Sequence, residues 1–580
     1  MEFTSLGLLV YFMLCGLAAL LASARGQGLL GRFRCKPRLV IRRTLMATLP
    51  DYVSAAKPVP QHARAAWYKN TAQTYAGIML WYVFWQQIAA SDPGTLGGVL
   101  ARGLWVALLG LVAAALFCHF LTYLVPGLLG MKTGLPLYVV GTSTYGVRGG
   151  LIMPGFLMGA LQFGWLAVNA FFASMLLCQA FEIGGTKEGD VFTVAIPGLV
   201  HGAVALVIIV LAVFVGLKGI QYVAKAATYV PLIPLVILVI LLVKTVGGVA
   251  HFKPETMIAD NRKAAEQKLQ ELQDDKVPAA KKEVSAAKTD EDKKKATDKL
   301  EAAQQRIKGT KALLAAENMS VLAVLLFMST YVVGFFATAG AAGADFGMNN
   351  RDANDVHLGG LAGIVGATAF AGGLSLIIVA GAYGTVDANG MPMISADFQG
   401  ELNAVTLTPS IVGPTAAKWM KFLLALSAFA PACVPAFIAA NSFKTTMPKF
   451  GMTAVGIGTA ASIFLAVSGW AGEVIPVFKV IGASFGPICG AMIADYLLSG
   501  RKWAGPRAAF NPAGWISWAV GFILGAIDLV ADKVPGLSGI ALGVPCPPMA
   551  ALIAGFVLYL ILAKAGLESK KLEMPRVATR

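Results

Sequence analysis

The chain has 580 residues, of which 57% are hydrophobic and only 13% are charged, and its mean hydropathy is +0.69. Soluble globular domains carry roughly 25% charged residues, so this composition excludes an ordinary soluble protein. The net charge of +16 does not indicate a nucleic-acid partner, because the basic residues gather beside the ends of apolar segments, as membrane topology requires.

The apolar segments are long enough to cross a membrane as helices. A span needs about 20 apolar residues, and continuous runs of that length favour an all-α polytopic membrane protein over a barrel of short alternating strands. The sequence predicts spans near residues 5–23, 70–91, 97–126, 151–181, 194–217, 221–248, 319–344, 358–382, 415–441, 450–471, 475–499, 511–531 and 548–565.

The first region, residues 1–69, is predicted to be a transmembrane helix followed by a basic linker. Arginines and lysines between Arg25 and Arg43 place the linker in the cytoplasm and the N-terminus outside. A cleaved signal peptide is the alternative, but the residues before the apolar run include Glu2 and no lysine or arginine. Alternation of the remaining spans puts the basic C-terminal tail in the cytoplasm of a multi-pass protein of the cell membrane.

The fourth span carries polar side chains at helical spacing. Gln162, Trp165 and Asn169 stand at i, i+3 and i+7, so they share one helix face. An indole flanked by two amides can stack on a planar ring and hydrogen-bond its edge. The alternative is a tryptophan that packs between helices, with interhelical amide bonds.

A charged insertion, residues 250–318, separates the sixth and seventh spans. It is rich in Ala, Lys, Glu, Gln and Asp, and alternation places it outside the cell. We expect two helices, at 255–276 and 279–316, broken near Val277 and Pro278 and paired as an antiparallel hairpin. The hairpin is either a solvated insertion without a chemical role or an arm on which a protein partner docks.

The seventh span contains small residues and glycines between Val333 and Gly340. They predict either a break in the helix, which would expose backbone groups to a ligand or ion, or close helix packing. The ninth span carries Pro431 and Pro435, which distort a helix. The stretch from Ala428 to Pro435 has no side-chain oxygen.

Four stretches together resemble the nucleobase:cation symporter-1 family, the purine, cytosine and hydantoin permeases. The resemblance runs from Pro58 to about residue 565 and leaves out the insertion and the first span. The stretches are PVPQHARAAWYKN from Pro58, GLPLYVVGTSTYGVRGG from Gly134, YVVGFFATAGAAGADF from Tyr331 and GASFGPICGAMIADYLLSG from Gly482.

The resemblance implies a LeuT-like (amino acid–polyamine–cation) core of twelve helices, to which the first span is an extra N-terminal helix. Residues 70–249 and 319–499 are then two inverted five-helix repeats, and residues 500–580 supply two more helices and the tail. The substrate is expected near the membrane midplane, between the repeats.

The resemblance also implies roles for particular side chains. Trp165 stacks on the substrate ring, Phe336 covers its opposite face, and Thr338 adds a hydroxyl. Gln162 matches an amide of the cytosine permeases, and Asn169 stands where hydantoin permeases have glutamine. In the family the helix that matches the ninth span supplies asparagine and sodium-binding hydroxyls, and this chain has neither between Ala428 and Pro435.

The function implied is import of a flat heterocycle, such as cytosine, a purine, uracil, allantoin or hydantoin, by symport with Na⁺ or H⁺. A transporter-like binding or sensing protein that lost ion coupling is the alternative. No nucleophile–base pair or metal-ligand cluster indicates an enzyme, and no cofactor is predicted.

Overall fold

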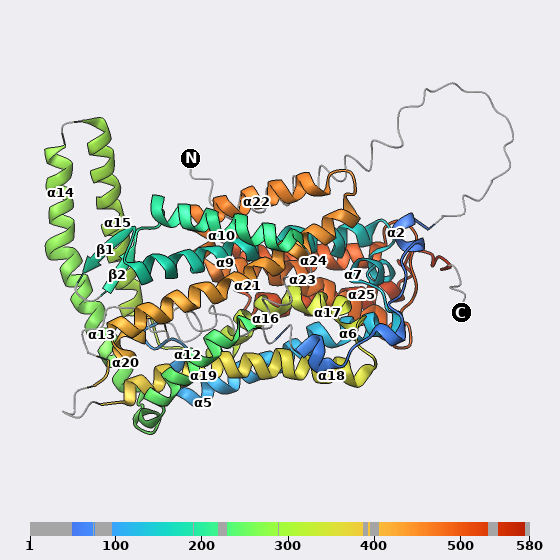
Figure 1. Cartoon of the computed structure of the whole chain (residues 1–580), viewed down its shortest axis with the longest axis horizontal. Helices are drawn as coiled ribbons and strands as arrows, with labels where there is room; N and C mark the ends of the chain where they lie inside the picture. The colour runs from blue at the N-terminus through green and yellow to red at the C-terminus, as the bar shows by residue number, and fades with distance from the viewer. Residues whose placement is uncertain are drawn as a thin grey trace.

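The computed structural model describes residues 49–72, 75, 95–188, 191–218, 229–287, 289–386, 392–394, 405–531 and 543–574. Within these residues, ten helices are long and apolar enough to cross a membrane. Most of them run along the long axis of the molecule (Figure 1). The prediction of an all-α polytopic fold is therefore confirmed.

The long helices follow the predicted spans in order. The predicted span at 5–23 lies outside the described residues, as does nearly all of the span at 70–91. The helices that the structure describes are α5 (Leu104–Phe117) continuing into α6 (Leu124–Thr133), α9 (Leu157–Phe181), α10 (Leu199–Lys218), α12 (Leu232–Thr245), α16 (Val321–Ala341), α18 (Ala353–Gly360) continuing into α19 (Ala367–Gly384), α21 (Pro414–Thr446), α22 (Gly451–Val467), α23 (Val474–Leu498), α24 (Pro512–Ala531) and α25 (Pro547–Lys564).

One boundary differs from the sequence prediction. The span expected at 97–126 begins at Leu104 and continues to Thr133. Gly103 has φ +93°, a conformation that favours glycine, and it separates a short turn at Gly98–Arg102 from α5. Hydropathy alone does not register such a backbone break, because apolar residues continue on both sides of Arg102 and Gly103.

Close contacts at small residues divide the helices into two groups. In one group, a Cβ on Gly159 of α9 would lie 2.7 Å from Phe443 of α21, and α10 and α22 pack beside them. In the other group, a Cβ on Gly340 of α16 would lie 2.5 Å from Thr122 of the span that includes α5 and α6. Small residues allow this close approach where lipid provides no hydrophobic drive. The candidate site lies between the groups.

A buried ion network fixes the last two helices to the rest of the bundle. Arg507, which is almost fully buried, donates to Asp495 of α23 at 2.9 Å and also pairs with Glu568 beyond α25. Ser143 of the short helix α8 (Thr142–Tyr145) donates to the same aspartate at 2.6 Å. These bonds compensate the cost of burying the charges.

The insertion forms a helical hairpin, but its turn is not where the prolines suggest. α13 (Pro254–Glu271) passes through a π-helical segment, Leu272–Lys276, into α14 (Val277–Ala286), so the first helical arm continues past the prolines to Ala286. Thr289 caps α15 (Asp290–Ala315) by accepting from the Asp292 amide at 3.1 Å. Pro278 is tolerated in the first turn of α14, where an amide proton has no essential partner. The prediction of a break at Val277–Pro278 is wrong.

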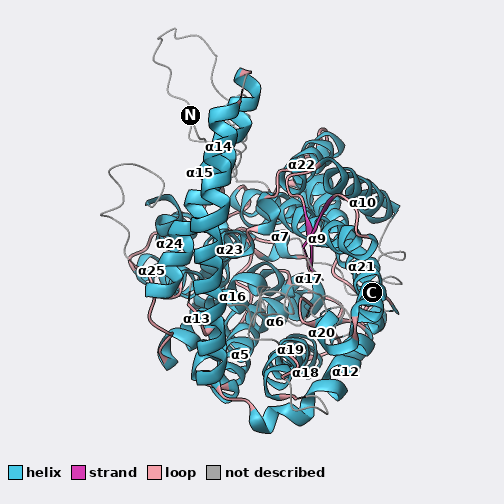
Figure 2. Ribbon diagram, turned by 90° about the vertical axis from the view of Figure 1, so that its left-hand side faces the viewer, coloured by secondary structure: helices cyan, strands magenta, loops and turns pink. Residues whose placement is uncertain are grey.

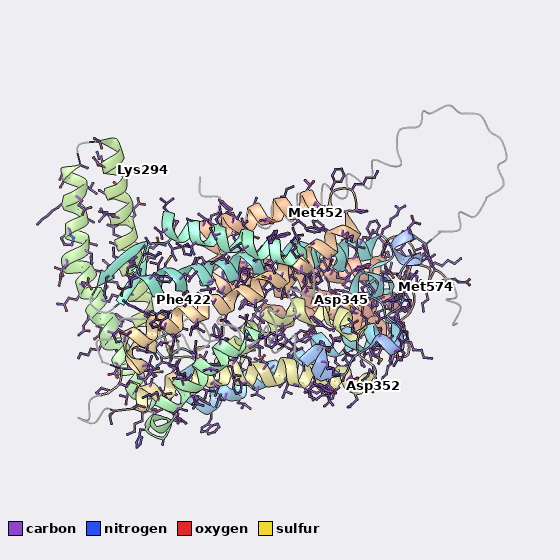
Figure 3. The ribbon with its side chains drawn as sticks, viewed as in Figure 1. Lys294, Asp345, Asp352, Phe422, Met452 and Met574 are labelled. Atoms are coloured by element: carbon purple, nitrogen blue, oxygen red, sulfur yellow. The ribbon has the colours of Figure 1, made fainter. Side chains whose placement is uncertain are left out.

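The hairpin is anchored at its base and free at its tip. Asn261 of α13 donates to the Leu96 carbonyl at 2.6 Å and accepts from Tyr383 of α19 at 3.1 Å. The tip stands apart from the helical body in both views (Figures 1 and 2). Lys294 on the hairpin and Asp352 before α18 lie at opposite ends of the molecule (Figure 3). A protein partner for the hairpin remains a prediction.

Smaller elements complete the described chain. A two-stranded antiparallel sheet, β1 (Gly185–Glu188) and β2 (Val191–Val194), joins α9 to α10, where the sequence predicted only a loop. The short helices are α2 (Asp51–Ser54), α7 (Leu137–Val140), α17 (Gly343–Gly347) and α20 (Thr408–Val412).

Candidate functional site

A cavity lies where α9, α16 and α21 approach one another. It encloses about 630 Å³ of space that no atom fills, part of which is open to solvent. Its lining combines aromatic rings, two amides and an apolar wall: Tyr75, Gln162, Trp165, Asn169, Phe335, Thr338, Ala339, Ala342, Phe346, Pro431, Val434, Pro435 and Ile438.

The α9 face of the cavity matches the sequence prediction. Gln162, Trp165 and Asn169 all line it, because their spacing places them on one face of a helix that runs unbroken from Leu157 to Phe181. Each side chain is more than nine-tenths buried. The structure therefore brings together the three residues that the pattern singled out, and their role in binding remains a proposal.

The amides on this face are incompletely satisfied. Asn169 donates from Nδ2 to the Trp165 carbonyl at 2.6 Å, while its Oδ1 is buried without a hydrogen-bond partner among the described residues. Gln162 donates only to the Sδ of Met158, at 3.5 Å. Buried amide groups normally find partners, and sulfur is a weak acceptor. The α9 face therefore has hydrogen-bonding capacity left for a ligand.

Trp165 is fixed by neighbours from α16 and α23. Its Nε1 donates to the Thr338 hydroxyl at 3.3 Å. The Phe335 ring meets the indole edge-on, with centroids 4.8 Å apart at 75°, and Phe478 lies 5.4 Å away. Edge-to-face contacts of this kind stabilise aromatic clusters. The indole is thus held in one orientation at the cavity wall.

Phe336 does not take the position that the resemblance implied. It is fully buried and does not line the cavity, whereas Phe335 does. An α-helix turns by about 100° per residue, so Phe335, Thr338 and Ala342 share one face and Phe336 points away from it. The i, i+3 spacing to Thr338 indicates Phe335 rather than Phe336. Phe335 therefore takes the place of Phe336 in the candidate site.

The seventh span is not broken at its glycines. α16 is continuous through Gly334 and Gly340 and ends at Ala341, after which α17 begins at Gly343. A Cβ on Gly334 would lie 2.8 Å from the Phe478 carbonyl. The glycines therefore serve close packing, which was the alternative interpretation, and the change of direction lies at Ala342.

Asp345 of α17 ties the end of this span to another segment. Its Oδ1 accepts from the Leu137 amide of α7 at 2.8 Å. Burial raises the pKa of the Asp345 carboxyl to about 6, against the lowering effect of that hydrogen bond. Figure 3 shows Asp345 within the helical body.

The α21 wall is almost purely apolar. Pro431, Val434, Pro435 and Ile438 line the cavity from a helix that runs continuously from Pro414 to Thr446. Because proline has no amide proton, the carbonyls of Ser427 and Pro431 lack their usual helical donors. Val434 and Ile438 offer no polar atom from their side chains, so polar side-chain recognition comes from the opposite face.

Comparison with known proteins agrees with this architecture. The profile of the family described as permeases for cytosine/purines, uracil, thiamine and allantoin matches residues 58–260. The matched region includes the α9 face of the cavity but ends before α16, so the family match does not reach Phe335 or α21. No curated protein matches the chain significantly.

Solved structures extend the likeness over most of the chain. A structure of Mhp1, described as a nucleobase-cation-symport-1 family transporter in a closed conformation with bromovinylhydantoin bound, is 13% identical. The match covers 88% of this chain and 95% of Mhp1, with a TM-score of 0.54. An inward-facing structure of Mhp1 is also 13% identical, covers 89% and 96%, and has a TM-score of 0.50. At this identity the likeness shows a shared fold.

Proposed function

We propose that the protein is a secondary transporter that carries a nucleobase or a related flat heterocycle across the cell membrane together with a cation. The observation that carries this proposal is the cavity itself, in which a fixed indole and two underused amides face an apolar wall. A flat ring has an apolar face for stacking and a polar edge for hydrogen bonding, so its chemistry complements this cavity.

Each predicted site residue has a distinct role in the proposed complex. Trp165 stacks on the ring, and Phe335 supports the indole edge. Gln162 and Asn169 bond the ring edge, and an unpartnered Asn169 Oδ1 favours a ligand N–H donor. Thr338 stays with the Trp165 indole and sets its orientation. Cytosine, purines, uracil and allantoin, which appear in the family description, and the hydantoin bound to Mhp1 support this substrate class.

The proposed orientation places the hairpin outside and the C-terminus in the cytoplasm. It rests on the basic residues of alternate loops, such as Arg501 and Lys502, which favour the cytoplasmic side. The separation of Lys294 and Asp352 along the molecule (Figure 3) fits their assignment to opposite membrane faces. Uptake into cells is the direction we propose for transport.

The test is uptake by the purified full-length protein in proteoliposomes. We expect at least one of labelled cytosine, uracil, hypoxanthine, allantoin and hydantoin to accumulate, and unlabelled compound to compete. Phe335→Leu should weaken competition, whereas Phe336→Leu, a matched change one residue away, should leave it unchanged in the folded fraction. Failure to bind or carry any of the five by protein that remains folded would refute the proposal.

A further inference from the structure

Two histidines from different spans meet inside the helical body. His119 lies in the π-helical segment Cys118–Tyr123 between α5 and α6, and His357 lies in α18. The Nε2 of His119 is 3.0 Å from the Nδ1 of His357. His119 is fully buried, and a Cβ on Gly360 would lie 2.5 Å from its Nδ1. The glycine therefore makes room for the imidazole.

Both spans depart from α-helical geometry beside this pair. His119 is itself in a π-helical segment, and a second one, Leu361–Gly366, begins four residues after His357. π-Helical segments are rare and are frequent at functional sites. These spans are the second helix of each predicted repeat, so the two halves of the protein carry the same irregularity where they meet.

The pair has neutral surroundings. Tyr123, with its ring 5.9 Å from that of His119, and Phe120, at 4.8 Å, are the aromatic neighbours on the same segment. α5, the second π-helical segment and the rest of α19 before Tyr383 carry no ionisable side chain.

Most of the charged groups on the other packed elements have partners. Asp355 of α18 pairs with Arg351, Asp345 of α17 accepts from Leu137, and Asp495 of α23 pairs with Arg507. Lys132 of α6 donates to Tyr496 of α23, whereas Lys479 of α23 is half-buried and Lys69 and Tyr68, in the turn packed on α18, are exposed.

The remaining ionisable groups are phenols and thiols. Tyr383 of α19 donates to Asn261, Tyr331 of α16 packs on Phe478, and Cys118 and Cys489 are buried.

Two neutral imidazoles can share only one proton in their common hydrogen bond. In either tautomer, the Nδ1 of His119 has no partner among the described residues. One added proton, taken from water, converts the pair to an imidazolium bonded to an imidazole, a charge-assisted bond. A charge is costly in apolar surroundings. The affinity of the pair for this proton therefore depends on how closely the surrounding helices pack against it.

The pair is connected to the cavity by direct packing. The ring of Tyr123 lies 5.4 Å from that of Tyr75, which lines the cavity. The Tyr75 hydroxyl donates to the Ala339 carbonyl of α16 at 2.7 Å, next to Thr338. A shift of His119 and Tyr123 on protonation would therefore reach the wall on which Trp165 is fixed.

We propose that the His119–His357 pair binds the co-transported cation and that this cation is a proton. The inference rests on the proposed transport function and names its coupling ion. The α21 wall supports it from the opposite side, because Ala428–Pro435 has no side-chain oxygen for a hard metal cation such as Na⁺ and offers only the backbone carbonyls that the prolines leave without donors. An imidazole pair needs no such ligands.

The first experiment separates coupling from transport. Labelled uracil, or whichever of cytosine, hypoxanthine, allantoin and hydantoin the unmodified protein carries fastest, is followed in proteoliposomes under a pH gradient, under a Na⁺ gradient and in exchange without a gradient. We expect the pH gradient to stimulate uptake by about fivefold or more, the scale of a typical coupling energy, and a Na⁺ gradient to have no effect. Stimulation by Na⁺ alone would overturn the inference.

The variants His119→Gln and His357→Gln keep a hydrogen-bonding group but cannot take up a proton near neutral pH. We expect both to lose stimulation by the pH gradient and to retain exchange. The matched control is His201→Gln, a buried histidine of α10 that bonds Ser174 at 2.8 Å away from this pair, and it should behave as the unmodified protein. Full stimulation in both pair variants would overturn the inference.

A measurement on the unmodified protein keeps the test decisive if the variants do not fold. Calorimetric titration with the same compound in buffers of different ionisation enthalpy counts the protons taken up on binding. We expect about one proton per ligand and an affinity that rises by up to tenfold per unit decrease in pH. Binding without proton uptake would refute the proton site and leave the transport proposal intact, whereas absence of both binding and uptake would refute transport itself.

Discussion

The two long helices that face each other across the cavity, α9 and α21, are the third helix of each predicted repeat, yet they differ in chemistry. α9 contributes an indole and two amides, whereas α21 contributes two prolines, a valine and an isoleucine. Hydrogen bonds to ligand edges give specificity, while apolar contact tolerates different shapes. The two equivalent helices therefore present different surfaces to the cavity, an amide-bearing one from α9 and an apolar one from α21.

The largest expected effect comes from removing the indole. Trp165→Ala should weaken ligand binding by roughly 1–3 kcal/mol, or about 5–150-fold in Kd, because ring stacking is lost. The control is Trp518→Ala, which removes another buried indole, stacked on Phe522 of α24 and outside the cavity lining. Binding isotherms on folded protein give both values, and equal effects of the two changes would argue against a site at Trp165.

Removal of an α9 amide should have a smaller effect. Asn169→Leu keeps the side chain's approximate size and deletes the free acceptor, so we expect a loss of about 0.5–1.5 kcal/mol in binding, or about 2–13-fold in Kd. The loss should be greater for compounds with an N–H on the matching edge than for their N-methyl analogues. Equal losses for both kinds of compound would contradict a direct hydrogen bond.

A polar substitution on the apolar α21 wall should change the affinity for the ligand only slightly. Val434→Thr places a hydroxyl on the apolar wall, and in a helix this hydroxyl can bond back to the carbonyl four residues earlier. We therefore expect less than about a threefold change in Kd, consistent with less than ~0.7 kcal/mol. A large gain in affinity, or the appearance of Na⁺ dependence, would show that α21 contributes to polar recognition after all.

The last prediction concerns stability rather than binding. The folded-state pKa of Asp345 is raised to about 6 from its usual 3.8, so the folded protein holds this proton more tightly than the unfolded chain. Its contribution to stability is therefore full below pH 4 and is lost as the pH rises to about 6. Asp345→Asn should remove this slope from the pH dependence of thermal unfolding, and an unchanged slope would contradict the assignment.

The sequence alone predicted the helical membrane fold and the α9 face of the cavity. Long uncharged runs predict membrane helices because the lipid leaves few alternatives, and the spacing of Gln162, Trp165 and Asn169 needs only helical periodicity. Phe336, which the resemblance implied, does not line the cavity, whereas the same periodicity favours Phe335 beside Thr338. The end of α14 at Ala286 and the start of α5 at Leu104 depend on backbone geometry that hydropathy does not report.

The pairing of His119 with His357 could not have been found from the sequence. They are separated by 238 positions, and each appears in its span as an isolated histidine. Only the packing of the two spans, with Gly360 beside the His119 ring, brings them together. Contacts between repeats of this kind depend on tertiary structure, whereas the face of a single helix does not.

The central claim is that a flat heterocycle binds against Trp165 between α9 and α21. The measurement that tests it most directly is an experimental structure of the full-length protein with the best-bound compound of the five. We predict planar density parallel to the Trp165 ring, with its polar edge toward Gln162 and Asn169 and its other side toward Val434. Density for the compound at any other place, with this cavity empty, would contradict the account.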